Sequence, residues 1–156
     1  MYWKTIRDVR VKNLQKCLVK LKKKYVVSQW IEDIVKKNKN KKFKKNKVVN
    51  LHRVNVRELG FKKPTTLKKI YLKLKSKGFS PVPMEYAIYA RSIYNEQPSG
   101  EWLRIAVPFS SMIDSDGVPH LPKLGKGLGK LFIETYWSYP GAIFHPHNDL
   151  NGSIDT

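Results

Sequence analysis

The chain has little cysteine and no long apolar run. Cys17 is the sole cysteine among 156 residues, which excludes a disulfide framework and a cysteine-based zinc site. No uncharged apolar stretch is long enough to form a transmembrane helix. Residues 1–11 carry alternating charges where a secretory signal would be apolar, so the sequence predicts a cytoplasmic protein.

Acidic residues are scarce in the first half of the chain. Residues 1–80 hold 26 Lys and Arg against 4 Asp and Glu, a net charge of +22, whereas residues 81–156 hold 5 against 8, a net charge of −3. Polyanions are the natural partners of such a basic half, nucleic acid before an anionic membrane surface. The alternative is a solvated basic surface that reflects the base composition of an AT-rich genome.

Arginine is also scarce, because 25 of the 31 basic residues are Lys. Lys is a point charge and lacks the planar fork with which Arg reads bases and phosphates. If the basic half binds nucleic acid, we therefore expect phosphate contacts and little base readout.

Helical periodicity predicts two basic helices near the N-terminus. Apolar residues recur at helical spacing over residues 14–25, and Ser28 is a suitable N-cap for a second helix over residues 29–37. The run Lys36–Lys47 then holds eight Lys in twelve positions, and charge of this density predicts an extended or mobile linker. Phe43 would either stack on a base or anchor the linker to the protein.

The remaining patterns predict an α+β fold. β-branched residues indicate a strand over residues 48–57, and alternating apolar residues indicate further strands over residues 101–109 and 131–137. Thr65 or Thr66 caps a third helix. Because the strands gather late and at short spacing, we expect N-terminal basic helices packed with a small, mainly antiparallel sheet.

These patterns divide the chain into three parts. Residues 1–47 form a basic helical segment with a Lys-rich linker, residues 48–147 an α+β domain, and residues 148–156 a flexible tail. The Gly- and Lys-rich residues 121–130 predict a loop, and their spacing does not fit a phosphate-binding loop for nucleotide hydrolysis.

The candidate nucleic-acid contacts lie in the Lys-rich linker and on the outward face of the third helix. Their charge suits the phosphate backbone, although a merely soluble helix face would carry similar residues. The candidates are Lys36, Lys37, Lys39, Lys41, Lys42, Lys44, Lys45, Lys47, Lys68, Lys69 and Lys73.

The densest group of metal-capable side chains is His145, His147 and Asp149. In an extended segment their spacing puts all three on one side, where a further ligand would complete a hydrolytic metal centre. Exposed polar loop residues are the simpler interpretation. No Ser-His-Asp or Cys-His pattern has supporting context, so the sequence favours a non-enzymatic protein and indicates no cofactor.

The middle of the chain carries a distinctive run, Gln97-Pro98-Ser99-Gly100-Glu101-Trp102-Leu103, followed by Asp114-Ser115-Asp116-Gly117. On these residues, positions 51–137 resemble a group of small uncharacterised bacterial proteins with no assigned activity. The resemblance implies a shared domain and no chemistry. Polar and aromatic residues at this helix–turn–strand junction would line a cleft or, as we favour, lock the junction: Glu85, Arg91, Tyr94, Gln97, Glu101, Trp102 and Arg104.

Three functions remain open from the sequence. The first is a non-enzymatic basic protein that associates with nucleic acid through phosphate contacts. The second is a protein-interaction module that uses the near-neutral residues 81–156. The third, which the sequence supports least, is a metal-dependent hydrolase or nuclease.

Overall fold

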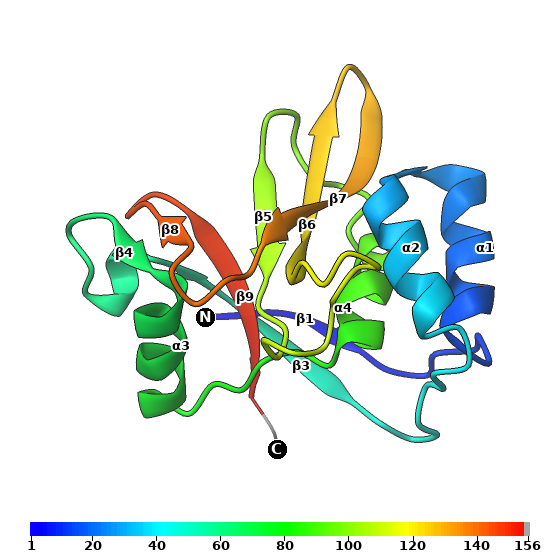
Figure 1. The fold of residues 1–156 in the computed structure, drawn as a ribbon, viewed down its shortest axis with the longest axis horizontal. Helices are drawn as coiled ribbons and strands as arrows, with labels where there is room; N and C mark the ends of the chain where they lie inside the picture. The colour runs from blue at the N-terminus through cyan, green and yellow to red at the C-terminus, as the bar shows by residue number, and fades with distance from the viewer. Residues whose placement is uncertain (155–156) are drawn as a thin grey trace.

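A seven-stranded sheet crosses the middle of the molecule (Figure 1). It is seen in a computed structural model that describes residues 1–154. Its strands are β1 (Tyr2–Ile6), β2 (Val26–Val27), β3 (Val49–Asn55), β5 (Trp102–Ile105), β6 (His120–Gly127), β7 (Lys130–Trp137) and β9 (Asp149–Ile154). They lie in the order β1-β3-β9-β5-β6-β7-β2, with β9 parallel to β5, β2 parallel to β7 and the other pairs antiparallel. A second sheet pairs β4 (Thr65–Thr66) with β8 (Ile143–Phe144).

Helices lie at both ends of this sheet and, in the case of α4, nearer its middle (Figure 1). They are α1 (Leu14–Lys24), α2 (Gln29–Lys37), α3 (Leu67–Ser76) and α4 (Met84–Tyr89), with 3₁₀ turns at η1 (Arg57–Leu59) and η2 (Ala90–Ile93). α1 and α2 lie at one end, and α3 lies at the other. The predicted α+β class, with basic helices packed on a mainly antiparallel sheet, is confirmed.

The helix boundaries follow from capping residues. The Asn13 side chain accepts from the backbone N–H of Lys16 at 2.9 Å, and Ser28 accepts from Trp30 at 3.1 Å, so α1 and α2 begin at the next residues. Thr66 caps α3, which the sequence predicted as one of two alternatives. The apolar stripe of α1 is buried in the core, as its periodicity predicts.

Residues 1–47 are part of the main sheet, which differs from the predicted separate helical segment. β1 pairs with β3, and β2 pairs Val26 and Val27 with Phe132 and Ile133 of β7. One hydrophobic core contains buried residues from both sides of the predicted boundary at residue 47. β2 has only two residues, too few for alternation to reveal it, and in β1 only the last of five residues is buried, so it shows no alternating pattern.

Residues 149–154 are a central strand, so the predicted flexible tail is wrong over this range; residues 155–156 lie outside the described part. β9 sits between β3 and β5, which satisfy its backbone on both edges. Gly152 pairs with His52 of β3 and lies beside Phe79 and Ser80, where an added Cβ would make only ordinary contacts of 3.5–3.6 Å. A polar, glycine-containing stretch is therefore a strand here because of its neighbours.

The predicted loop over residues 121–130 is wrong for the same kind of reason. Residues 120–127 form β6, which pairs with β5 and β7. A Cβ on Gly125 would lie 2.2 Å from the Trp102 ring, so this glycine admits the indole flat against the strand. Among residues 1–154, no helix is long and apolar enough to cross a membrane.

Candidate nucleic-acid interface

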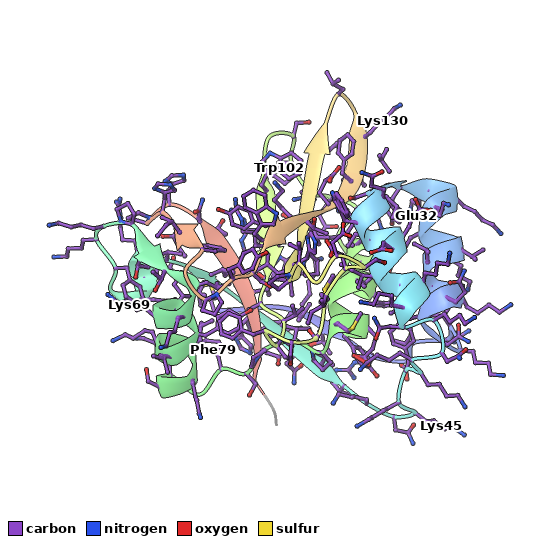
Figure 2. All side chains as sticks on the ribbon, in the orientation of Figure 1. Glu32, Lys45, Lys69, Phe79, Trp102 and Lys130 are labelled. Atoms are coloured by element: carbon purple, nitrogen blue, oxygen red, sulfur yellow. The ribbon has the colours of Figure 1, made fainter. Side chains whose placement is uncertain are left out.

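The candidate lysines lie on two surfaces at opposite ends of the molecule. Figure 2 labels Lys45 beside α1 and α2 and Lys69 on α3, far apart along the longest axis. From the sequence alone, these lysines form one group. In the structure, Lys68, Lys69 and Lys73 lie apart from the segment Lys36–Lys47. We call the α1 side the basic end. It comprises the lysines of α1, the segment Lys36–Lys47 and the turn between β6 and β7.

The segment Lys36–Lys47 is fastened to the protein through its one apolar residue. Phe43 meets Tyr86 and Tyr89 edge-on, with ring centroids 5.2 and 5.8 Å apart. The backbone N–H of Lys44 donates to the Tyr86 hydroxyl at 3.1 Å. Of the two roles predicted for Phe43, the structure supports the anchor. The segment therefore forms a held loop, and most of its lysines are exposed.

α1 connects this loop to the opposite edge of the basic end. The backbone N–H of Leu14 donates to the Lys41 carbonyl at 2.8 Å, which places the loop at the start of the helix. Lys16, Lys20 and Lys23 are exposed along the helix. With 11 residues, α1 spans about 16 Å, so its lysines continue the charge of the loop over several phosphate spacings.

A basic cleft lies at the far end of α1. Its volume is about 410 Å³, and residues from the end of α1, from β2 and from the β6–β7 turn line it. Its lysines are Lys22, Lys23, Lys24, Lys126 and Lys130. Lys22 also forms an ion pair with Glu32. Sequence reasoning missed this convergence because Lys126 and Lys130 belong to the half of the chain with a net negative charge.

Arg91, on η2, supports the β6–β7 hairpin from below. Its side chain is fully buried and donates to the carbonyls of Gly125 at 3.2 Å and Phe132 at 2.9 Å, one on each strand. It also donates to the Gln97 side chain at 2.8 Å. Burial lowers the pKa of Arg91. Because Gln97 in turn donates to the Leu124 carbonyl at 3.0 Å, two buried side chains fix the base of the hairpin.

The junction residues predicted as a cleft are mostly interlocked. The Tyr94 hydroxyl donates to Glu101 at 2.6 Å, and Arg53 forms ion pairs with Glu101 at 3.0 Å and Asp149 at 2.7 Å. Burial lowers the pKa of Arg53, but the hydrogen bonds to Glu101, Asp149 and Tyr94 outweigh it, so the pKa is raised. These contacts, with those of Arg91 and Gln97, support the locking role that the sequence favoured.

Three members of the predicted cleft lie elsewhere. Glu85 is buried on α4, 3.9 Å from the Lys41 ammonium. Trp102 and Arg104 project from β5 on the outer face of the sheet, where Arg104 lies 4.3 Å from the Tyr136 ring centroid. Lys123 lies 4.7 Å from the Trp102 ring centroid, and burial followed by the nearby Arg104 charge lowers its pKa.

The predicted metal ligands do not form a metal site. His145 and His147 are exposed, and their rings stack with centroids 5.7 Å apart. Asp149 is instead bonded to Arg53 at 2.7 Å and to the Asn55 side chain at 3.1 Å. Within residues 1–154, no group of three His, Cys, Asp or Glu side chains is placed to hold a metal ion. The spacing put the three residues close in sequence, but the ion pair with Arg53 engages the carboxylate.

A chain of polar residues connects the buried Asp114 and His120 to the half-buried Thr135. His120 Nε2 lies 2.8 Å from Asp114 Oδ2, and Nδ1 lies 3.0 Å from the Thr135 hydroxyl. The sequence did not link these three residues. Asp114 also accepts from the backbone N–H groups of Asp116 and Val118 at 2.8 and 2.9 Å. We assign the chain a structural role, because its contacts fasten the 114–118 turn to β7.

No family model, no curated protein and no solved structure matches the chain. The surfaces of the molecule are therefore the guide to its function.

Proposed function

We propose that the protein binds nucleic acid through phosphate contacts at its basic end. The observation that supports this most strongly is the convergence of lysines from the end of α1 and from the β6–β7 turn at one cleft. The loop over residues 36–47 adds further lysines at the opposite end of α1, so that Lys45 and Lys130 lie far apart in Figure 2. Lysines that the fold brings together from distant segments form a surface, whereas a charge run in sequence alone does not.

The chemistry of this surface fits the phosphate backbone. Ammonium groups are compact charges that neutralise phosphates and release counterions. The basic end carries lysines and no arginine in its cleft. Since bidentate arginine contacts are the commonest means of reading guanine, the surface suits binding that varies little with sequence.

Two features present these lysines to a ligand in a fixed arrangement. Phe43 anchors the loop, and Arg91 holds the hairpin. A phosphate backbone therefore meets a surface that is already ordered, which lowers the entropy cost of binding.

The proposal is tested by fluorescence anisotropy with labelled single- and double-stranded DNA and RNA across a salt series. With about 6–10 phosphate contacts, affinity for duplex DNA should fall about 10³–10⁵-fold between 50 and 200 mM salt. The variant neutralises four lysines at the cleft: Lys23→Gln, Lys24→Gln, Lys126→Gln and Lys130→Gln. Each phosphate contact that it removes should lower the slope of log K against log salt by about 0.9.

A matched control removes the same charge from the other end. It carries Lys68→Gln, Lys69→Gln, Lys73→Gln and Lys75→Gln, all on the exposed face of α3. We expect the control to keep the wild-type slope. A flat salt response of the wild type would refute the proposal, as would equal losses in the two variants. Recovery of a protein partner that resists nuclease, without any nucleic-acid binding, would favour the interaction-module alternative.

A further inference from the structure

The tip of the β6–β7 hairpin exposes a leucine completely. Leu128 has a relative accessibility of 100%, the highest among the exposed large hydrophobic residues. Its backbone has a φ of +51°, and the next residue, Gly129, has a φ of +74°. The two residues form a tight turn between Gly127 and Lys130, the end residues of β6 and β7.

The stability of the hairpin does not explain why residue 128 is a leucine. Two-residue turns with two positive φ angles favour Asn-Gly, Asp-Gly or Gly-Gly, because other side chains are strained in the left-handed region. The fully exposed Leu128 side chain gains nothing from burial in the described chain. An apolar residue that is both strained and exposed indicates a role outside folding.

The surroundings of Leu128 are narrow, rigid and cationic. Lys126 and Lys130 flank the tip, and Gly127 and Gly129 add no side chain beside it. Arg91 bonds to the carbonyls of Gly125 and Phe132 below, so the hairpin is held at its base. In Figure 2 the hairpin carries Lys130 near its tip and projects beyond the rest of the molecule.

From this arrangement we propose that Leu128 is a wedge that inserts between base pairs of duplex DNA from the minor groove. Lys126 and Lys130 then contact the phosphates on either side. The inference rests on the proposed nucleic-acid function. Proteins that bind the minor groove insert single apolar side chains between base steps, unstack them and kink the duplex. The hairpin presents such a side chain at the end of a narrow two-stranded ribbon. Each of the two strands carries one lysine near the tip.

The same features fit a duplex better than a membrane. Stable membrane attachment needs a large apolar surface or a second anchoring signal. Here one leucine stands between two glycines, so the tip offers a single apolar side chain. One side chain is sufficient for a wedge, because only one base step has to be opened.

The test compares the wild type with Leu128→Asn. Asparagine suits the positive φ and preserves the turn, so this variant removes the wedge without unfolding the hairpin. A short DNA duplex carries a FRET pair on its two ends, and protein is added at low salt. The wild type should raise transfer efficiency by bending the duplex. Leu128→Asn should bind with an unchanged salt slope and bend it much less.

The outcomes separate the wedge from the function on which it depends. If Leu128→Asn bends the duplex as the wild type does, or if the wild type binds without bending, the wedge is refuted and phosphate binding stands. If the wild type does not bind at all, the proposed function itself fails. A Leu128→Trp variant provides a second readout, with expected quenching of the indole by the duplex. A blue shift on phosphatidylglycerol vesicles without quenching by DNA would refute the wedge in favour of a membrane contact.

Discussion

The two lysine-rich ends of the molecule have the same chemistry but different construction. At the basic end, lysines from the end of α1 and from the β6–β7 turn meet around a cleft on a hairpin held by Arg91. A loop anchored by Phe43 carries further lysines at the other end of α1. At the other end, exposed lysines lie on α3, beside an apolar groove of about 500 Å³, and at Lys62 and Lys63 just before β4. In the sequence alone, both ends look like similar runs of positive charge. The difference teaches that convergence and support, and not charge density, distinguish a binding surface from a solvated face.

The largest expected effect comes from removing the support of the hairpin. Arg91→Met should lower the free energy of unfolding by about 3 kcal/mol, because it leaves buried acceptors on Gly125, Phe132 and Gln97 without a donor. Urea denaturation measures the loss. Hydrogen exchange at residues 125–132 should also accelerate.

A control for this prediction lies on α3. Lys75→Met removes the same kind of charge from an exposed position and should change stability by no more than about 0.5 kcal/mol. Arg91→Met with wild-type stability would show that the hairpin does not depend on this side chain.

A smaller effect is expected from releasing the loop. Phe43→Ala should cost about 1–2 kcal/mol, because it removes a half-buried ring and its edge-on contacts with Tyr86 and Tyr89. Hydrogen exchange should increase over residues 38–47. Leu72→Ala on α3 is the matched change, and it should be nearly neutral because Leu72 is 61% exposed. Equal losses in the two variants would contradict the anchoring role of Phe43.

The hairpin tip gives an effect of opposite sign. Leu128→Asn should stabilise the protein by about 1 kcal/mol, because asparagine tolerates the positive φ that strains leucine. Thermal unfolding measures the gain. The same exchange on α3, Leu72→Asn, should destabilise by a few tenths of a kcal/mol through helix propensity. If Leu128→Asn lowers stability, then leucine does contribute to the folded hairpin and the case for the wedge weakens.

The smallest effect is a pH dependence that belongs to the basic end. Hydrogen bonds from the Ser115 hydroxyl and then from its backbone N–H lower the pKa of Asp33 on α2. This stabilisation is present above the ordinary carboxyl pKa, and it is lost as the pH falls through the lowered value. Ser115→Ala should therefore flatten the decline of the urea midpoint below about pH 4. Ser99→Ala, at an exposed turn, should leave the decline unchanged, and an identical decline in all three proteins would refute the link.

The local parts of the fold could be predicted from sequence. α2 begins after Ser28 and spans residues 29–37 as predicted, because capping and helical periodicity act over a few residues. β6 and β9 could not, because they depend on partners far away in sequence. Gly125 leaves room for the Trp102 ring, and β9 is a strand because β3 and β5 pair with it. A composition that looks like a loop becomes a strand when a distant neighbour needs the space.

The candidate site, too, could be predicted from the sequence only where its residues are close together in the chain. The lysines of the loop were found because they form a run, and Phe43 was recognised as its possible anchor. The meeting of Lys22, Lys23 and Lys24 with Lys126 and Lys130 was missed, because it depends on the pairing of β2 with β7. The run G-K-G-L-G-K contained the signal of a hairpin turn, since glycines on both sides of a short segment favour a tight reversal.

The most direct test of the central claim is a lysine footprint. Acetic anhydride labels the 25 lysines in the presence and absence of duplex DNA, and mass spectrometry quantifies each site. We expect protection of Lys23, Lys24, Lys126 and Lys130 and of the loop lysines Lys39, Lys42, Lys44 and Lys45, while Lys68, Lys69, Lys73 and Lys75 remain reactive. Protection of the α3 lysines to the same or a greater extent would contradict the account.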